Sequence, residues 1–340
     1  MAFERLSWGI FLTNFIYLLG LTQGALVIAV ILRLGSARWS AGFFRLAAAV
    51  ALFFAPVAVV MLVVVLGGDS AFNAAREASH PWNNDLFFFV RHTLSLLVFY
   101  AAAWALLRFS IAKRSVLTLT PFLLIAFVMN ETFVAWDLGM LLNVHFADAI
   151  YAPFFIVGSI FSGVALLILI MAGVKRYLGS TLFTAEHFKS MGQLLLAFSL
   201  IWAYFWWSQF ITIWYANVPE ETESLYLRIF SPGYSKIYFA TMALIWVIPF
   251  SLLIFRRVRQ SVGALSGISV SVLCGLWLDR YLMVMPAVGE KQKIASLPLL
   301  DLGSALFTLA LLGVLGVMFA KRLSRKPEIL SVGEDVMGWQ

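Results

Sequence analysis

Long apolar runs separated by short polar connections cover almost the whole chain. A transmembrane α-helix needs about 20 consecutive, mostly apolar residues. Nine runs reach this length, at about residues 6–34, 43–66, 85–108, 116–135, 151–174, 191–214, 237–255, 262–285 and 299–320. No long soluble domain interrupts them. The pattern therefore predicts an all-α integral membrane protein of about nine transmembrane helices.

A connection rich in Pro, Gly and Glu, at residues 216–233, divides the predicted helices into two sets. We expect a peripheral transmembrane helix at 1–34, a first four-helix bundle at 35–174, a second four-helix bundle at 175–320 and a cytoplasmic tail at 321–340. The first run is too long for the apolar region of a signal peptide, so we interpret it as an uncleaved helix.

Composition excludes a soluble enzyme. Hydrophobic residues make up 62% of the 340 residues and charged residues only 12%, whereas an average soluble chain carries roughly 25% charged residues. A soluble fold of this composition would lack polar side chains for its surface. In a bilayer the same apolar side chains can face lipid, which removes the difficulty.

The numbers of cysteine and histidine residues limit which cofactors this chain can bind. A single cysteine, Cys274, excludes an internal disulfide and a Cys-ligated iron–sulfur cluster. Of the four histidines only His92 lies clearly inside an apolar run, and a bis-His haem needs two at matched depth. We therefore expect no haem, no iron–sulfur cluster and no metal site in this chain.

Charge predicts the orientation. Most of the 24 Lys and Arg residues lie in the connections after the first, third, fifth and seventh helices and in the tail, whereas most of the 17 Asp and Glu residues lie on the opposite side. Cytoplasmic loops carry the excess of basic residues. We expect a bacterial inner-membrane protein with a periplasmic N-terminus and a cytoplasmic C-terminus. The net charge of +7 is explained by these loops and does not require nucleic acid.

Costly polar side chains gather in the outer part of the predicted helices. An ionisable residue inside a bilayer costs about 2.5–3.5 kcal/mol on insertion scales, so it needs a partner or a function. We expect four residues to take part in proton transfer and five to bind a ligand. The first set is His92, Glu131, Asp137 and Asp279, and the second is Arg91, Tyr204, Gln209, Tyr215 and Arg280.

An apolar pocket edged by these groups suits a lipophilic ligand with two polar oxygens, such as a quinone. Oxidation of a quinol also needs a proton acceptor, for which His92 or a nearby carboxylate is suitable. A purely structural explanation stays open for each residue. Arg280 would then pair with Asp279 or Glu131, and Arg91 with Asp137, as ties between helices.

Two segments carry a resemblance to a known family. The run LFTAEHFKSMGQLLLAF at 182–198, followed by WAYFWWSQFITIWYANVPEET at 202–222, resembles the quinone-binding subunit 2 of alternative complex III, in the NrfD-like family of polysulfide-reductase membrane subunits. The stretch WLDRYLMVMP at 277–286 is similar to the family's penultimate-helix motif. Asp137, Met140 and Leu142 match a further motif, in which Leu138 and Leu141 stand where the family has Trp and Ser.

The resemblance implies a membrane subunit of a respiratory or photosynthetic quinol-oxidising complex. Its cofactor would be menaquinone or ubiquinone. Its partners would be a second NrfD-like membrane subunit, an iron–sulfur protein and a multihaem cytochrome c on the outer face, besides membrane lipid.

Two other functions stay open at this point: a secondary transporter, and a structural or proton-conducting subunit without a redox role. Transporters usually place their site at the midplane between broken helices. The predicted polar groups lie above the midplane, which favours the redox subunit.

Overall fold

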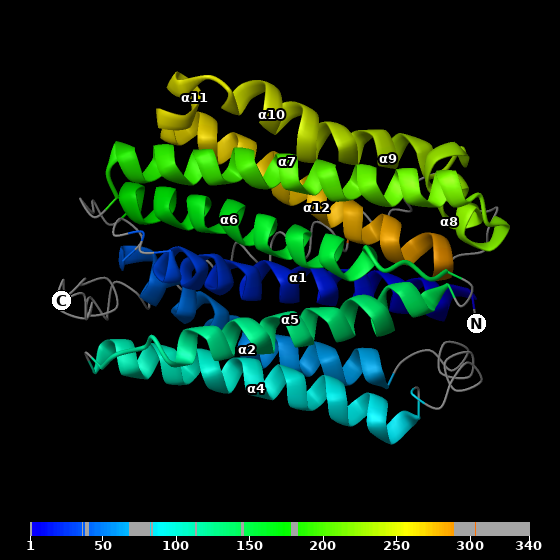
Figure 1. Ribbon diagram of the computed structural model, residues 1–340, viewed down its shortest axis with the longest axis horizontal. Coiled ribbons are helices and arrows are strands. Elements are labelled where there is room, and N and C mark those ends of the chain that lie inside the picture. The colour runs from blue at the N-terminus through cyan, green and yellow to red at the C-terminus, as the bar shows by residue number, and fades with distance from the viewer. Residues whose placement is uncertain are drawn as a thin grey trace.

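The computed structural model describes residues 2–35, 37, 41–67, 82, 84–112, 114–143, 146–177, 183–288 and 303. Its elements are α1 (Ala2–Leu34), α2 (Ala41–Leu66), α4 (Asp85–Ile111), α5 (Leu119–Leu138), the short 3-10 turn η3 (Met140–Leu142), α6 (Tyr151–Tyr177), α7 (Ala185–Ala216), α8 (Pro219–Phe230), α9 (Ser235–Met242), the π-helical turn η4 (Ala243–Val247), α10 (Ile248–Leu253), α11 (Arg256–Gln260) and α12 (Val262–Val288). Long helices run side by side along the molecule (Figure 1).

Eight spans in the described ranges are long and apolar enough to cross a membrane. They are α1, α2, α4, α5 with its η3 extension, α6, α7, the run α9–η4–α10, and α12. The predicted all-α membrane fold is confirmed. The predicted ninth helix, 299–320, apart from residue 303, and the tail, 321–340, lie outside the described residues.

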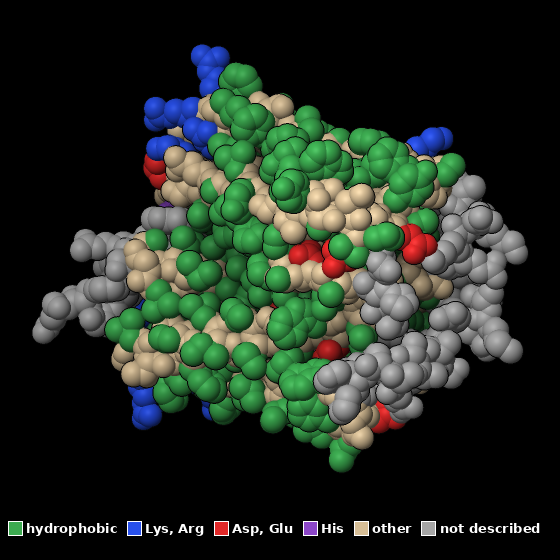
Figure 2. Space-filling view, turned by 45° about the vertical axis from the view of Figure 1, so that its right-hand side comes forward, with side chains coloured by type: hydrophobic (Ala, Val, Ile, Leu, Met, Phe, Trp, Pro, Cys, Tyr) green, Lys and Arg blue, Asp and Glu red, His purple; other side chains and the backbone are tan. Residues whose placement is uncertain are grey.

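The uneven distribution of charged side chains along the helices is visible on the surface. Most Lys and Arg side chains gather at one end of the molecule and most Asp and Glu side chains toward the other, with an apolar band between them (Figure 2). Such a band is what a bilayer-spanning surface requires, because lipid cannot solvate charged groups.

The first helix is central, so the prediction of a peripheral helix at 1–34 is wrong. Of the eight spans α1 is the most buried. It packs against α2, α5, α6 and α12, and Figure 1 shows α1 and α6 as the middle of the molecule. The helices α2, α4 and α5 lie on one side of this middle pair, and α7, α9–α10 and α12 lie on the other.

Small residues explain the central position of α1. A Cβ built on Gly20 would overlap the hydroxyl of Ser159, and one built on Gly24 would overlap the Ser159 carbonyl. On the facing helix α6, a Cβ on Gly163 would overlap the backbone at Gly24 and Ala25. Small residues four apart let two membrane helices approach closely, and van der Waals contact then replaces the hydrophobic effect as the driving force. The Gly20–Gly24 spacing is the signal that identifies α1 as an inner helix.

Candidate functional site

The first polar cluster joins α4 to α5 and consists of Arg91, His92 and Asp137, called here the α4–α5 cluster. Arg91 Nε donates to Asp137 Oδ2 at 2.7 Å, and His92 Nε2 lies 3.0 Å from the same oxygen. All three residues are buried. The predicted pair Arg91–Asp137 therefore exists, and His92 joins it.

Aromatic rings surround the guanidinium of this cluster. The Arg91 Cζ atom lies 5.0 Å from the ring centre of Trp82, 5.2 Å from that of Phe87 and 4.9 Å from that of Phe88. Such contacts help to hold a cation away from water. Arg91 Nη1 donates to the Trp82 carbonyl at 2.7 Å. Arg91 Nη2 is buried and has no hydrogen-bond partner among the described residues, so one strong donor is left for a further acceptor.

The α4–α5 cluster continues inward as a chain of hydrogen bonds. Ser95 Oγ lies 3.1 Å from the His92 carbonyl and donates to Asn130 Oδ1 at 2.9 Å. Asn130 Nδ2 donates in turn to Gln23 Oε1 of α1 at 3.1 Å. Neither Asn130 nor Gln23 was predicted as a site residue, although an amide in the middle of an apolar helix is a signal that could have found both.

The second polar cluster joins α5, α6 and α12 and consists of Glu131, Ser159, Asp279 and Arg280, called here the α5–α6–α12 cluster. Ser159 Oγ lies 2.6 Å from Glu131 Oε2, and Arg280 Nη2 lies 3.4 Å from Ser159 Oγ. Ser159 is thus the link between Glu131 and Arg280. Ser159 was not predictable as a site residue, because serines are frequent in membrane helices and nothing in the local sequence distinguishes this one.

Arg280 is held from several sides. Its Nη2 donates to the Phe155 carbonyl at 2.7 Å, its Cζ lies 3.7 Å from the centre of the Phe155 ring, and its Nη1 lies 3.6 Å from Asp279 Oδ2. A Cβ on Gly158 would come within 2.8 Å of Arg280 Nη2, so this glycine leaves the space that the guanidinium occupies. Glu131 Oε1 is buried and has no hydrogen-bond partner among the described residues.

The two clusters lie on different faces of α5. Asp137 and Glu131 are six residues apart, and at roughly 100° per residue this separation turns their side chains by about 120° around the helix axis. The contacts agree, since Asp137 faces α4 whereas Glu131 faces α6. The residues predicted to edge one pocket are therefore divided between two separate clusters.

Three predicted site residues belong to neither cluster. Gln209 of α7 donates to Asp148 Oδ2 at 2.6 Å and so ties α7 to the connection before α6. Tyr204 and Tyr215 are 65% and 84% exposed, so both face outward. Their outward direction could not be predicted from the sequence of α7. Aromatic side chains suit contacts with lipid and with protein equally, so the apolar run does not show which face of the helix is inward.

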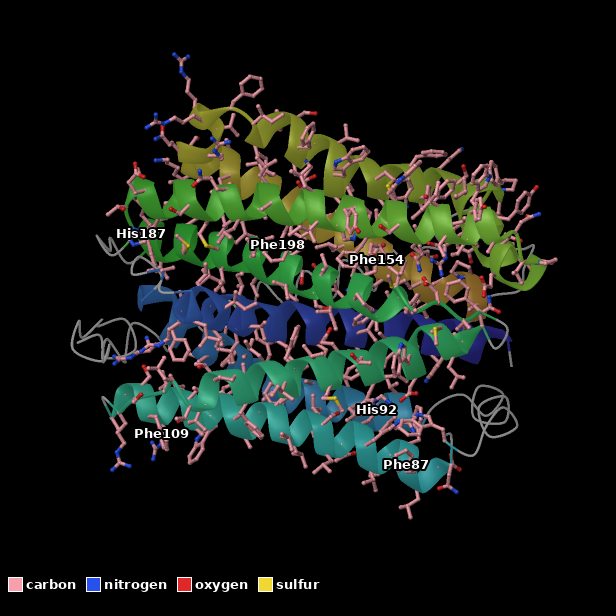
Figure 3. All side chains as sticks on the ribbon, in the orientation of Figure 1. Phe87, His92, Phe109, Phe154, His187 and Phe198 are labelled. Atoms are coloured by element: carbon pink, nitrogen blue, oxygen red, sulfur yellow. The ribbon has the colours of Figure 1, made fainter. Side chains whose placement is uncertain are left out.

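No group of three or more His, Cys, Asp and Glu side chains placed to hold a metal occurs within the described part of the chain. Figure 3 shows His92 on α4 beside α5, near the end of the helix at which Phe87 lies. The other labelled histidine, His187, lies at the opposite end of the molecule. The acid–base groups of the α4–α5 cluster are thus confined to one end of the transmembrane region.

Comparison with protein families agrees with the fold. The family model "Polysulphide reductase, NrfD" matches residues 1–289, from α1 through α12. The chain belongs to the NrfD family. As an NrfD chain it is a membrane subunit of a redox complex, in a family associated with quinones. Among curated proteins none matches the chain.

Proposed function

We propose that this NrfD chain binds a quinol at the α4–α5 cluster and takes part in its oxidation. The observation that carries the proposal is the buried Arg91–His92–Asp137 cluster with one unused donor, Arg91 Nη2. A quinol or quinone presents a polar oxygen at each end of a flat apolar ring. Arg91 suits one such oxygen, and the rings of Phe87, Phe88 and Trp82 suit the apolar part.

The residues of the cluster divide the work between binding and proton transfer. Asp137 pairs with Arg91 and orients the imidazole of His92. An imidazole oriented by a carboxylate is a suitable acceptor for a proton released from a hydroxyl group. Arg91 fixes the position of the oxygen, because a charge-assisted hydrogen bond is stronger than a neutral one. The quinol gives up its two electrons to the redox cofactors of partner subunits, and its two protons leave through His92 one after the other.

Access from the bilayer supports this location. The side chains of Leu86, Phe87, Phe89 and Val90, in the first turns of α4 next to Arg91, are exposed and apolar. In a membrane such a surface faces lipid, where a hydrophobic quinol dissolves. A short lateral movement would bring a headgroup from lipid to the buried guanidinium.

We further propose that the end of the molecule carrying the α4–α5 cluster is periplasmic, with the N-terminus on that side and the C-terminus in the cytoplasm. The partners would be an iron–sulfur protein, a multihaem cytochrome c and a second NrfD-like subunit, as in alternative complex III. A cysteine introduced at Glu223 in α8 would react with a membrane-impermeant maleimide added from the periplasm. A reaction only with maleimide added from the cytoplasmic side would show that the orientation is the opposite one.

A proton-conducting role is the second candidate. Polar side chains favour it: Ser95 contacts the His92 backbone carbonyl, and hydrogen bonds from Ser95 to Asn130 and from Asn130 to Gln23 lead toward the middle of α1. Both roles require the α4–α5 cluster, but only quinol oxidation requires a bound quinone. Organic extraction of the purified native complex, followed by chromatography, separates them.

The decisive experiment uses the complete complex in native membranes. His92→Gln keeps a polar side chain of similar size but removes the titrating group, and we expect turnover with quinol to fall on the order of 100-fold, because general acid–base catalysis contributes about 10²–10⁴. Tyr215→Phe is the matched control on the exposed surface. Partner subunits should copurify with both variants. Unchanged quinol oxidation in His92→Gln would overturn the proposal.

A further inference from the structure

The short helix α11 forms a corner between two membrane spans at the basic end of the molecule. The backbone leaves helical geometry at Phe255 (φ −77°, ψ 122°) and again at Ser261 (φ −85°, ψ 113°). A single helical turn thus connects α10 to α12, and it also contacts α7. Figure 1 shows α11 at one end of the molecule, which is the end where Lys and Arg side chains gather in Figure 2.

Arg259 holds this corner in place. Its Nη1 donates to the carbonyls of Leu253 and Ile254, at the end of α10. The last carbonyls of a helix have no partner within the helix, and basic side chains commonly bind them. The stem of Arg259 packs against α7, since a Cβ built on Gly192 would lie 3.2 Å from the Arg259 Cβ. The guanidinium of Arg259 is therefore used by the protein itself.

The other two arginines of α11 are not used in this way. Arg256 and Arg257 are both exposed, and neither forms an ion pair with another described residue. Arg256 lies close enough to Glu186 of α7 for their charges to interact. However, the Glu186 carboxylate is bound to Lys189 Nζ at 2.9 Å. Two adjacent guanidinium groups are thus left without a carboxylate of their own.

Further cations lie close to this turn. Lys175 and Arg176, at the end of α6, are exposed. Lys175 Nζ lies 5.4 Å from the ring centre of Phe188 on α7, so the end of α6 adjoins the start of the helix that α11 contacts. A surface with one sign of charge attracts ions of the other sign. The turn therefore favours an anionic ligand.

The residues just before the arginines indicate which anion fits. Leu252, Ile254 and Phe255 are exposed and apolar, and Phe255 is 61% exposed. This apolar surface ends where the cationic turn begins, at Arg256. The hydrocarbon core of a bilayer likewise ends where the polar headgroups begin. A phospholipid has both parts at this level, whereas a free phosphate ion would use the arginines alone.

We propose that Arg256 and Arg257 bind the phosphate group of an anionic phospholipid, while an acyl chain of the same lipid packs against Ile254 and Phe255. The planar guanidinium suits a phosphate because it donates two parallel hydrogen bonds to a pair of its oxygens. Basic side chains beside a membrane span attract anionic lipids in the same way. This lipid site lies apart from the α4–α5 cluster and does not depend on the quinol.

The test measures which lipid lies next to α11 in the complete complex, reconstituted in vesicles. A genetically encoded coumarin amino acid replaces Ser261, which is exposed directly after α11. Phospholipids with a doxyl group on the acyl chain quench the coumarin when they lie beside it. The two probes are anionic doxyl-phosphatidylglycerol and zwitterionic doxyl-phosphatidylcholine, and the measurement is the mole fraction of each that halves the fluorescence.

We expect the phosphatidylglycerol probe to reach half-quenching at a roughly 30-fold lower mole fraction than the phosphatidylcholine probe, because each arginine contributes a preference of about fivefold. The combined change of Arg256→Gln and Arg257→Gln should bring the two lipids within about fivefold of each other. Arg256→Lys with Arg257→Lys keeps both charges and should keep most of the preference. Copurification of partner subunits checks that each variant assembles.

The matched control is Arg108→Gln with Arg114→Gln. Both residues are exposed and belong to the end of α4 and the connection after it, on the other side of the central helices from α11 (Figure 1). This control removes the same charge from the same end of the molecule and should leave the preference at α11 unchanged. An equal loss of preference in the control would show a general effect of surface charge and would overturn the site.

The remaining outcomes also overturn it. Equal quenching by the two lipids in the wild type, or an unchanged preference in the double glutamine variant, would show that the arginines bind no anionic lipid. Displacement of the phosphatidylglycerol probe by inorganic phosphate, exchanged for chloride at constant ionic strength, would identify free phosphate as the ligand. Absence of quenching by either lipid would show that another protein segment covers α11.

Discussion

The two polar clusters, on different faces of α5, hold similar charges in very different surroundings. The α4–α5 cluster places one arginine against one carboxylate and a histidine, under exposed aromatic side chains and with an unused donor. The α5–α6–α12 cluster places one arginine among two carboxylates, where three transmembrane helices and a glycine enclose it. Exposed apolar side chains of α4 lie beside the first cluster, whereas side chains from three transmembrane helices surround the second.

The difference indicates different roles. A donor without a protein partner, close to lipid, is suited to a ligand that comes and goes. A guanidinium that contacts a backbone carbonyl, an aromatic ring and a serine is suited to holding helices together, as the structural explanation for Arg280 requires. Both clusters keep unused hydrogen-bonding capacity, at Arg91 Nη2 in the first and at Glu131 Oε1 and Asp279 Oδ2 in the second. The exposed apolar side chains beside Arg91 therefore carry the distinction.

The largest expected effect is a loss of stability of the complex, which should be greater for the α5–α6–α12 cluster than for the α4–α5 cluster. Arg280→Met removes the cation from between Asp279 and Glu131 and leaves buried carboxylates uncompensated, which costs about 3–5 kcal/mol when one partner of a buried pair is removed. We expect the complex to lose most of its thermal stability, measured as the loss of assembled complex in native gels after heating. Arg91→Met, which removes the cation from the other cluster, should reduce stability less, because it leaves one carboxylate instead of two and His92 still contacts that carboxylate. Equal losses would remove the distinction between the clusters.

The next effect concerns turnover. Asp137→Asn keeps the shape of the side chain but removes the anion that orients His92, and we expect quinol oxidation to fall on the order of 100-fold while the assembled complex remains. Steady-state quinol oxidation in membranes, normalised to the amount of copurified partner subunit, measures it. If Asp137→Asn disassembled the complex as Arg280→Met does, the α4–α5 cluster would be a helix tie as well.

A smaller effect tests the link inside the α5–α6–α12 cluster. Ser159→Ala removes the hydroxyl between Glu131 and Arg280 and should destabilise the complex by about 1–3 kcal/mol, the cost of leaving a buried polar group unsatisfied. Ser162→Ala is the control, because Ser162 is also buried on α6 but its hydroxyl donates only to the Ser159 carbonyl, at 2.7 Å. Its loss should cost about 0.5–1.5 kcal/mol. Thermal denaturation of both purified variants provides the comparison, and a larger loss for Ser162→Ala would contradict it.

The smallest effect is expected at α7. Tyr204→Phe should change neither turnover nor stability, because the side chain of Tyr204 is exposed and lies in neither cluster. Quinol oxidation and the melting temperature of the complex measure both. A fall in turnover with intact assembly would show that Tyr204 belongs to the functional site, and would contradict the division into two clusters.

Much of the fold follows from the apolar pattern, because spanning a bilayer requires a length and a composition that each helix displays by itself. The pairs Arg91–Asp137 and Arg280–Asp279 were also predictable as possibilities, since buried charges in membranes need partners. The Gly20–Gly24 spacing also indicates an inner position for α1, because small residues four apart let membrane helices approach closely.

Which of these polar residues come together in space was not predictable from the sequence. Depth along a helix can be counted from its ends, so the outer position of Glu131, Asp137 and Arg280 follows from the sequence alone. The direction in which each side chain points depends on how the helix is rotated about its axis, and that rotation is set by packing against neighbours distant in sequence. Asp137 and Glu131 lie on one helix, only about 9 Å apart in depth, and only the tertiary structure assigns them to different clusters.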